Sequence, residues 1–508
     1  MPDRTLTRIS TGLPQLDDVL GGGLPVSRLY LVEGMPGSGK TTLGLQFLLD
    51  GVAAGEKVLY VTLSETGEEL AEVAAGHGWS LDGITLFELG EAGLPLGIEG
   101  DQSILHSWEL ELGEIVHHIT NQVDELKPTR VVFDSLSELR LLAQDPLRFR
   151  RQILSLKQFF NRNSATVLLM DDMTARGSHD VDLHSLAHGV LTLERKTLDF
   201  GISRRRLQVQ KLRGSGFREG YHDFAIRRGG LHVFPRLVAS EHHADFSDAP
   251  LQSGLPKLDA LLGGGPLRGT STLITGPAGS GKTTIVLQYI AEAARRGERC
   301  VLYEFDERIS TLLIRANAIG IDLQPFIDLD LVHIRQMDPS EISPGEFTSI
   351  VKCEVEENNS RMIVIDSMNG YIAAMPQEKE LILQLHELLS FLNQQGVTTF
   401  LINPQQGLVG TMNSGSLNIS YIADAVILLR FFEAEGRVRK ALSILKNRGN
   451  LHEDTIRELM ISKRGLELSE PLARFSGVLT GTPTYTGGRG PLLGASRFLD
   501  PQDDNGAP

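Results

Sequence analysis

The sequence is poor in cysteine, in long apolar runs and in positive charge, and each shortage excludes a class of protein. Its 508 residues include only two cysteines, Cys300 and Cys353, which we interpret as small buried apolar side chains and not as a disulfide or a metal pair. Its apolar runs fall short of the roughly 20 residues that span a bilayer, and its first residues lack the apolar segment of a signal peptide. A formal net charge of −15 disfavours a broad nucleic-acid-binding surface. We therefore expect a cytoplasmic protein without a membrane or nucleic-acid partner.

A glycine-rich motif occurs twice. Residues 34–42 read GMPGSGKTT and residues 276–284 read GPAGSGKTT, and both fit the phosphate-binding pattern GxxxxGK[ST]. A strand-like apolar run precedes each motif, and an amphipathic helical pattern follows it. Such a turn aims backbone N–H groups and the positive end of a helix dipole at a phosphate chain. The motifs therefore predict two nucleotide-binding sites, for ATP or GTP.

Particular roles are expected of the residues in these loops. Lys40 and Lys282 should reach the β- and γ-phosphates, and the hydroxyl groups of Thr41 and Thr283 should bind Mg²⁺. The full set of loop residues predicted to bind ATP is Gly37, Ser38, Gly39, Lys40, Thr41 and Thr42 in the first loop, and Gly279, Ser280, Gly281, Lys282, Thr283 and Thr284 in the second.

The repetition extends beyond the loops. Residues 11–23, TGLPQLDDVLGGG, match residues 253–265, SGLPKLDALLGGG. The starts of this match are 242 residues apart (253 − 11), and so are Lys40 and Lys282 (282 − 40). One common offset indicates a tandem duplication.

Strand-like and helical patterns alternate within each copy. This alternation predicts an α/β fold in which a mainly parallel sheet is flanked by helices and ligands bind at the carboxyl ends of the strands. We predict domains at residues 1–240 and 250–480, joined by a polar linker in which His242 and His243 face solvent, and a disordered Gly/Pro-rich tail at residues 481–508.

Acidic residues follow several of the predicted strands. Asp134 and Asp366 end apolar runs, where they are expected to orient the water shell of Mg²⁺. Glu65 in the first copy, and Asp306 with Glu307 in the second, are candidates to polarise the water that attacks the γ-phosphate. We place the strands that precede them beside the phosphate-loop strands. The alternative for these acids is a solvated residue at the start of a helix.

Two pairs of cations stand two residues apart along predicted strands. They are Lys211 with Arg213 and Lys446 with Arg448, and within each pair both side chains should point to one face. If the chains form a ring, these cations can enter a neighbour's site and stabilise transition-state charge. The alternative is a solvated face.

Together these features resemble the RecA-like ATPases of the KaiC family. The resemblance rests on the tandem GSGKTT loops, the GLPxLD segments that end in three glycines, the acids after the next strand, the apolar-Asp-Ser strands and the KxRG strands, and it covers about residues 5–480. It implies two tandem RecA-like P-loop NTPase domains assembled as a homohexameric double ring, with ATP between subunits and Mg²⁺. It further implies slow hydrolysis in the N-terminal ring, self-phosphorylation and dephosphorylation in the C-terminal ring, and a KaiB-like or other signalling partner.

The resemblance also assigns residues by position. Its paired catalytic glutamates fall on Ser64 with Glu65 and on Asp306 with Glu307, so the first member is changed in both copies. We assign Glu65 to hydrolysis and Asp306 or Glu307 to the second ring, with Asp306 also a candidate metal ligand. The residues expected to contact a neighbour's nucleotide are Lys211, Leu212 and Arg213 in the first ring, and Lys440, Lys446, Asn447, Arg448 and His452 in the second.

The family's adjacent Ser-Thr phosphoacceptors fall on Ser420 and Tyr421. Ser420 keeps an acceptor hydroxyl, whereas the phenol of Tyr421 is longer than a threonine side chain. We therefore expect one phosphorylation site, Ser420, in a protein used in signalling or timing.

Two other functions stay open. The changed acids favour a nucleotide-gated scaffold with little catalysis. A RecA- or helicase-type motor on DNA would need basic, aromatic-bearing loops. The main basic cluster, residues 203–206, adjoins the strand with Lys211, and we assign it to a subunit interface first.

Overall fold

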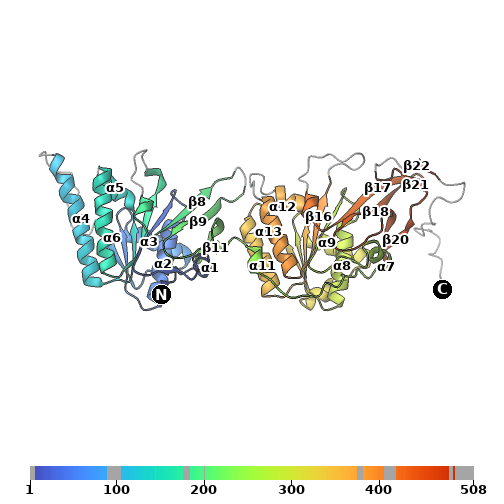
Figure 1. Ribbon diagram of the computed structural model, residues 1–508, viewed down its shortest axis with the longest axis horizontal. Helices are drawn as coiled ribbons and strands as arrows, with labels where there is room; N and C mark the ends of the chain where they lie inside the picture. Colours follow the sequence, from blue (N-terminus) through green and yellow to red (C-terminus); the bar gives the residue numbers. More distant parts are fainter. Residues whose placement is uncertain are drawn as a thin grey trace, which may run out of the picture. The chain divides into compact units, whose positions relative to one another are not determined.

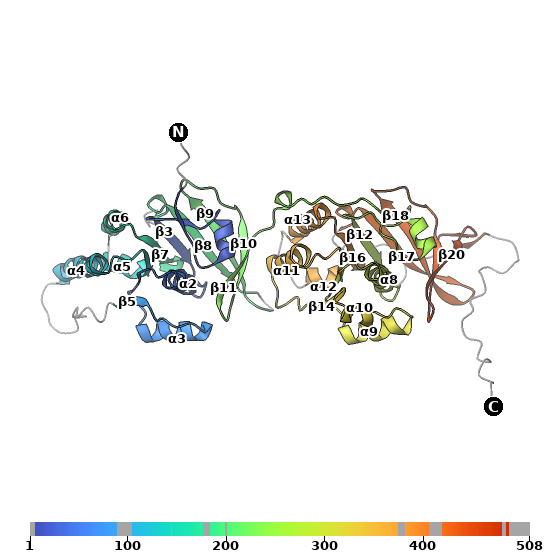
Figure 2. The same cartoon turned by 90° about the horizontal axis from the view of Figure 1, so that it is seen from below.

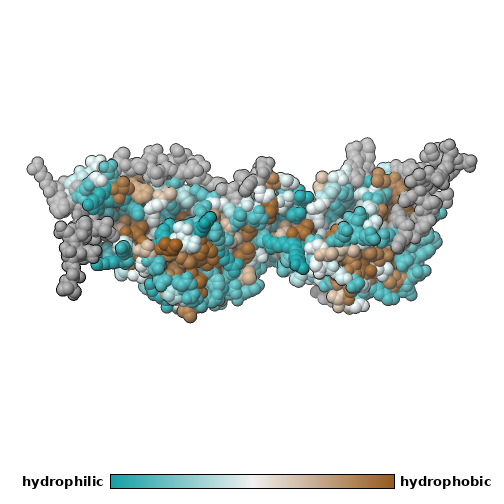
Figure 3. Space-filling view, turned by 180° about the vertical axis from the view of Figure 1, so that it is seen from behind, coloured by the Kyte–Doolittle hydropathy of each residue, from teal (hydrophilic) through white to brown (hydrophobic). Residues whose placement is uncertain are grey.

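The computed structural model describes residues 6–88, 104–143, 145–175, 183–198, 201–373, 381–405, 419–479 and 484–486. It divides the chain into two compact units, Met1–Arg236 and Leu237–Pro508. Each unit has a central sheet with helices on both faces (Figures 1 and 2). On the face shown in Figure 3, apolar patches on both units interrupt a largely hydrophilic surface.

The first unit is built on a nine-stranded sheet in the order β11-β10-β9-β8-β3-β7-β6-β4-β5. The strands from β8 to β5 are parallel to one another, and β9, β10 and β11 extend the sheet by antiparallel pairing. The strands are β3 (Leu29–Gly34), β4 (Val58–Thr62), β5 (Ile84–Glu88), β6 (Arg130–Asp134), β7 (Thr166–Asp172), β8 (Gly189–Lys196), β9 (Arg204–Leu212), β10 (Tyr221–Arg227) and β11 (Gly230–Phe234). The helices are α1 (Pro14–Val19), α2 (Lys40–Ala53), α3 (Gly67–His77), α4 (Ile104–Leu126), α5 (Leu136–Ala143) and α6 (Pro146–Arg162). A separate short pair, β1 (Arg8–Ile9) and β2 (Leu24–Pro25), lies near the start.

The second unit repeats this sheet in the order β14-β13-β15-β16-β12-β17-β18-β19-β20. The strands are β12 (Ser271–Gly276), β13 (Cys300–Glu304), β14 (Val332–Gln336), β15 (Met362–Asp366), β16 (Thr398–Pro404), β17 (Ala425–Ala434), β18 (Arg437–Asn447), β19 (Arg457–Ser462) and β20 (Gly465–Pro471). The helices are α7 (Pro256–Leu261), α8 (Lys282–Arg295), α9 (Ile309–Ala318), α10 (Gln324–Asp328), α11 (Pro344–Glu356), α12 (Met368–Ala373) and α13 (Leu381–Gln394). The predicted α/β fold with a mainly parallel sheet in each copy is thus confirmed.

The central strands are apolar throughout because helices cover both faces of the sheet. In β3, Tyr30 and Val32 pack with α1, α2 and α3, whereas Leu29 and Leu31 pack with α4, α5 and α6. All four side chains are at most 3% exposed. Successive residues of a strand point to opposite faces, so a strand buried on both faces has no polar alternation.

One expectation about strand order is wrong. The phosphate-loop strand β3 lies between β7 and β8, and β4, which leads to Glu65, is separated from β3 by β6 and β7. In the second unit β15 and β16 separate β13 from β12 in the same way. The chain forms the outer strand β4 first, and the later strands β6 and β7 then fill the space between β4 and β3. The order of the strands in the sequence therefore differs from their order in the sheet. As a result β4 lies beside β6, and Thr62 pairs with Asp134.

The segment between the two units packs on the second one. Leu237 is buried in the core formed with α11 and α13. His242, expected to face solvent, instead lies with its Nδ1 2.9 Å from a carboxylate oxygen of Glu356 and its ring edge-on to Phe391. The expectation for His242 is wrong because this polar-looking segment runs along an apolar helix surface, while His243 is exposed as expected.

The remaining expectations concern the cysteines, the tail and the membrane. Cys300 is buried, Cys353 is only partly buried, and both are free thiols. Within the predicted tail, β22 (Thr484–Tyr485) pairs with β21 (Phe475–Ser476), and residues 481–483 and 487–508 lie outside the described ranges. Of the helices described, none is both long and apolar enough to cross a membrane.

Candidate nucleotide-binding sites

In each unit the glycine-rich motif forms the turn between the central strand and the first long helix. Helix α2 begins after Gly39, whose φ is 107°, and α8 begins after Gly281, whose φ is 104°. Gly37 and Gly279, two residues earlier, have φ values of 71° and 75°. These left-handed conformations favour glycine and turn successive N–H groups toward one point. The two loops therefore have the backbone shape of a phosphate cradle.

The loop lysines fold over these cradles. Lys40 donates from Nζ to the carbonyl of Gly34 at 2.8 Å, and Lys282 donates to the carbonyl of Gly276 at 3.0 Å. Burial lowers the pKa of Lys282 to about 8, despite the opposing charge of Asp366. The other predicted loop residues, Ser38, Thr42, Ser280 and Thr284, are buried in the same turns.

A threonine hydroxyl and an aspartate meet beside each loop. Thr41 donates to Oδ2 of Asp134 at 3.2 Å, and Thr283 donates to Oδ2 of Asp366 at 2.7 Å. Burial raises the pKa of Asp134, and burial with the nearby charge of Asp306 raises that of Asp366 to about 6. Buried oxygen atoms with too little positive charge around them are suitable ligands for a divalent cation.

The candidate base of the first unit, Glu65, follows β4, which pairs with the strand that ends in Asp134. Ser64 is exposed, but Glu65 turns inward, and its Oε2 is buried without a hydrogen-bond partner among the described residues. Burial and the charge of Asp134 raise the pKa of Glu65. The N–H of Glu65 donates to the hydroxyl of Thr62 at 3.0 Å, which fixes the turn after β4. A carboxylate so placed can accept a proton from water near the phosphates.

In the second unit the two candidate acids point in different directions. Asp306 accepts a hydrogen bond from the hydroxyl of Ser367, the residue after Asp366. Glu307 instead forms an ion pair with Arg315 at 2.8 Å. Of the pair, Asp306 thus lies beside Asp366, the candidate metal ligand, and Glu307 is paired with a residue of α9.

A third acid, which the sequence pattern did not predict, lies in the second unit. Glu304 ends β13, is 2% exposed and has its pKa raised to about 8 by burial and by Asp366. Its Oε1 accepts the N–H groups of Asp306 and Glu307 at 3.2 and 3.0 Å, so it shapes the turn as Thr62 does in the first unit. In the sequence, Glu304 is marked only by its position at the end of an apolar strand-like run.

The cation pair of the first unit holds a short turn of its own chain. This turn is η3 (Leu183–Ser185), which precedes β8. Lys211 donates to the carbonyls of His184 and Ala187, and Arg213 donates to the carbonyl of Ser185 at 2.8 Å. Both cations therefore lie on the same face, over this turn.

The second unit repeats the arrangement around the candidate phosphoacceptor. Lys446 donates to the carbonyl of Ser420 at 3.0 Å, and Arg448 donates to that of Tyr421 at 3.2 Å. Ser420 lies in η5 (Ile419–Tyr421), the counterpart of η3. The structure thus brings the candidate acceptor and the candidate interface cations together on one surface.

The other residues expected at an interface have mixed environments. Leu212 is 5% exposed, so its side chain belongs to the core of the first unit. Asn447 donates to the carbonyl of Leu262 at 3.1 Å, and burial lowers the pKa of Lys440. His452 lies in the loop after β18 and is partly exposed.

Two arginines near the first loop were not predicted as ligands. Arg195 is the second-last residue of β8 and lies beside Gly37, and it pairs with Arg205 of β9. A signal was present, because Arg205 precedes Lys440 by the 235 residues (440 − 205) that also separate Lys211 and Lys446 (446 − 211).

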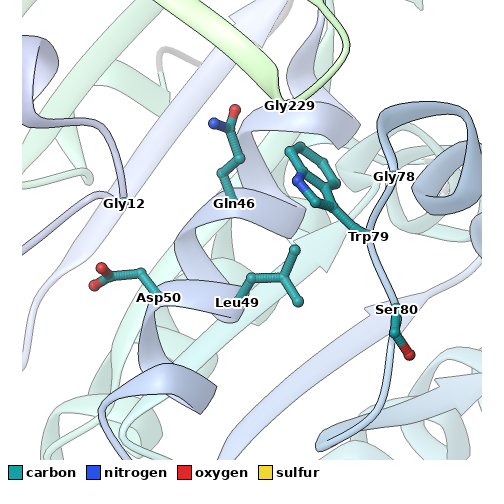
Figure 4. A pocket seen from close by; sticks show the side chains of 8 residues that line it. All are labelled: Gly12, Gln46, Leu49, Asp50, Gly78, Trp79, Ser80 and Gly229. Carbon is teal, nitrogen blue, oxygen red and sulfur yellow. The ribbon is translucent and has the colours of Figure 1, made fainter.

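One hollow of about 510 Å³ lies away from the phosphate loop (Figure 4). Gln46 and Asp50, on the later turns of α2, line one side of it, and Trp79 lines the other. Asp50 is in turn paired with Arg130 at 2.9 Å. Because Lys40 begins α2, the hollow is not part of the nucleotide site.

The similarity to known proteins extends over both units. The KaiC ATPase family model matches residues 9–238 and 251–473. The circadian clock protein KaiC3 of Synechocystis sp. is 27% identical over 492 residues, which cover 95% of each chain. The circadian clock oscillator proteins KaiC of Parathermosynechococcus lividus and Synechococcus elongatus are 28% and 27% identical, over 95% of this chain and 89% and 92% of theirs.

Proposed function

Because this chain belongs to the KaiC family of ATPases, we propose that it forms a homohexameric double ring with ATP bound between subunits in both rings. The first ring hydrolyses ATP, and the second transfers phosphate to and from Ser420. The observation that carries this proposal is the repetition of the phosphate loop, the threonine–aspartate pair and the Lys-x-Arg strand in both units.

Magnesium fits the oxygen donors beside each loop. Thr41 with Asp134, and Thr283 with Asp366 and the nearby Asp306, would hold the ion and its waters. When bound, the ion neutralises negative charge on the phosphate oxygens.

Hydrolysis in the first unit is assigned to Glu65. Its inward carboxylate and raised pKa suit an acceptor for the proton of the attacking water. Lys40 binds the phosphates, and Lys211 with Arg213, lent by a neighbouring subunit, stabilises the charge that develops on them.

Phosphate transfer in the second unit is assigned to Ser420 as the acceptor, with the carboxylate of Asp306 as the base that accepts the proton of the Ser420 hydroxyl group. Lys446 and Arg448 hold the turn that carries Ser420, so acceptor and cations reach a neighbour's site together. Tyr421 is 56% exposed on the same turn. This surface is the side of the second unit that we place at the subunit interface.

Assembly and cellular role follow from the family. Exposed apolar side chains on both units support assembly, among them Leu141 and Leu147 in the first and Val438 and Leu451 in the second. The relatives are named as circadian clock proteins, and for this chain we propose a role in signalling or timing in the cytoplasm, with a KaiB-like or other signalling partner.

Labelling with γ-³²P-ATP tests the kinase. We expect label on Ser420 in the wild type and none in Ser420→Ala or Lys282→Ala. Undiminished label in Ser420→Ala would remove this assignment, and phosphate release in the same samples reports hydrolysis.

A nucleotide-gated scaffold is the second candidate, because Ser64 replaces an acid that the family has. It predicts ATP-driven assembly without phosphate release or label.

A further inference from the structure

Arg195 lies against the phosphate loop of its own unit. A side-chain carbon built on Gly37 would be 3.0 Å from Nη1 of Arg195. Gly37 is one of the glycines that shape the cradle, so the guanidinium of Arg195 lies beside this cradle. Arg195 itself is exposed at the end of β8, and nothing in the sequence pattern marked it.

A second guanidinium stands beside it. Arg195 of β8 and Arg205 of β9 are paired residues on adjacent strands. Burial, followed by the charge of Arg195, lowers the pKa of Arg205. Among the residues that the structure describes, the buried Nε of Arg205 has no hydrogen-bond partner. Within the described ranges neither arginine forms an ion pair, and Arg195 donates only a long bond, 3.4 Å, to the hydroxyl of Ser203. Two adjacent cations next to a phosphate cradle favour an anion between them.

The second unit lacks this arrangement. There the cross-strand pair is Phe431 with Lys440, so an aromatic ring takes the place of Arg195. One cation remains where the first unit has two. The two loops are otherwise alike in their glycine conformations, so the extra charge is a property of the first site.

We propose that Arg195 contacts the phosphates of the nucleotide that is bound to the first phosphate loop of its own chain, and that the second site has no such contact. The inference rests on ATP binding to the first unit. A guanidinium can give two parallel hydrogen bonds to phosphate oxygens, and its charge opposes the charge that develops in phosphoryl transfer. This cation from the same chain acts together with the cations we assign to the neighbour.

The test uses the full-length chain carrying Lys282→Ala, which silences the second site. Binding of a fluorescent ATP analogue and release of phosphate are compared between this parent and the same chain with Arg195→Ala. We expect a weaker affinity and a slower turnover, each by roughly 10- to 100-fold, the factor for removing one hydrogen bond to a charged group. Arg195→Lys keeps the positive charge but cannot form two parallel hydrogen bonds, so we expect a smaller loss of affinity and turnover than in Arg195→Ala.

Arg162→Ala is the matched control. Arg162 is exposed in the last turn of α6, just before β7 begins, whereas the phosphate loop follows the carboxyl end of β3, so its loss should leave binding unchanged. A reciprocal change, Phe431→Arg in a chain with Lys40→Ala, should tighten binding in the second site.

The outcomes separate two failures. If the parent chain binds no nucleotide, the proposed function fails. If the parent binds and hydrolyses ATP while Arg195→Ala matches it, and Phe431→Arg gains nothing, the assignment of Arg195 is overturned.

Discussion

The two units share a fold and a phosphate loop but differ in the acids around it. In the first unit Glu65 turns toward Asp134 behind an exposed Ser64, whereas in the second unit Asp306 takes the position of Ser64 and contacts the residue next to Asp366. The cradle is thus constant, and the position that presents a carboxylate differs by one residue. One chain carries two sites that we expect to differ in chemistry, although a single motif describes both.

The surroundings of the loop lysines differ as well. Asp172 at the end of β7 lies 3.7 Å from Lys40. Although partial burial opposes it, hydrogen bonds from Thr174 and the charge of Lys40 lower the pKa of Asp172. Pro404 occupies the matching end of β16, and Lys282 has a lowered pKa through burial. The first lysine is therefore partly neutralised by a carboxylate, and the second is desolvated.

Replacing each loop lysine should separate the two sites most strongly. We expect Lys40→Ala to remove one of two ATP equivalents bound per chain and to spare labelling of Ser420, and Lys282→Ala to remove the other together with the label. Loss of such a charged contact weakens affinity by roughly 100-fold or more. Equilibrium dialysis with labelled ATP measures this, and loss of both equivalents in either variant would contradict independent sites.

Exchanging the acids for amides should show which one acts in each unit. Glu65→Gln should slow phosphate release by roughly 100-fold or more, as expected for loss of a general base. In the second unit Asp306→Asn should slow labelling of Ser420, whereas Glu307→Gln should change it only slightly, because Glu307 is engaged with Arg315. A larger effect of Glu307→Gln than of Asp306→Asn would reverse our assignment.

Glu304 should make the stability of the second unit depend on pH. Its pKa is raised from 4.5 to about 8 in the folded chain, so the protonated form is favoured there. The resulting stabilisation is complete below pH 4.5 and is lost as pH rises through about 8. Glu304→Gln removes this dependence, and the free energies of unfolding of the two proteins should diverge by up to about 5 kcal/mol by pH 9.

Hydrogen exchange of peptides from β13 and β15 measures this divergence. Both tryptophans, Trp79 and Trp108, belong to the first unit, so denaturant unfolding followed by their fluorescence is the internal control and should not change. Equal pH profiles for the wild type and Glu304→Gln would show that Glu304 is already ionised in the folded chain.

The smallest effect should come from Asp172. Asp172→Asn removes a partner from Lys40, and we expect ATP to bind the first site more tightly by less than about fivefold, as for a weak, partly exposed ion pair. Pro404→Asp is the reciprocal change and should weaken the second site. Titration of a fluorescent ATP analogue in chains with the other site silenced measures both, and tighter binding in Pro404→Asp would contradict this electrostatic account.

Much of the fold was predictable because the patterns that define strands and helices are local. The strand expected before the first phosphate loop is β3, Leu29–Gly34, and the helix expected after it is α2, Lys40–Ala53. The order of strands was not predictable in the same way. The distance of β4 from β3 depends on which strands later fill the centre of the sheet.

The site was predictable where one motif contains all its members. Lys40 and Thr41 stand next to each other in the sequence, so their shared location needed no structure. Arg195 and Gly37 meet only because β8 pairs with β3, and Glu304 was hidden as the last residue of an apolar strand. Side chains brought together by sheet pairing are therefore the part that the pattern left open.

The central claim is that each nucleotide site is completed by a second copy of the chain. It can be tested by mixing two inactive variants, Lys282→Ala, which cannot bind ATP in the second unit, and Ser420→Ala, which cannot accept phosphate. After subunit exchange with γ-³²P-ATP, we predict label on Ser420 of the Lys282→Ala chain, although neither variant labels alone. A mixture that forms joint rings but stays unlabelled, while the wild type labels, would contradict transfer between chains.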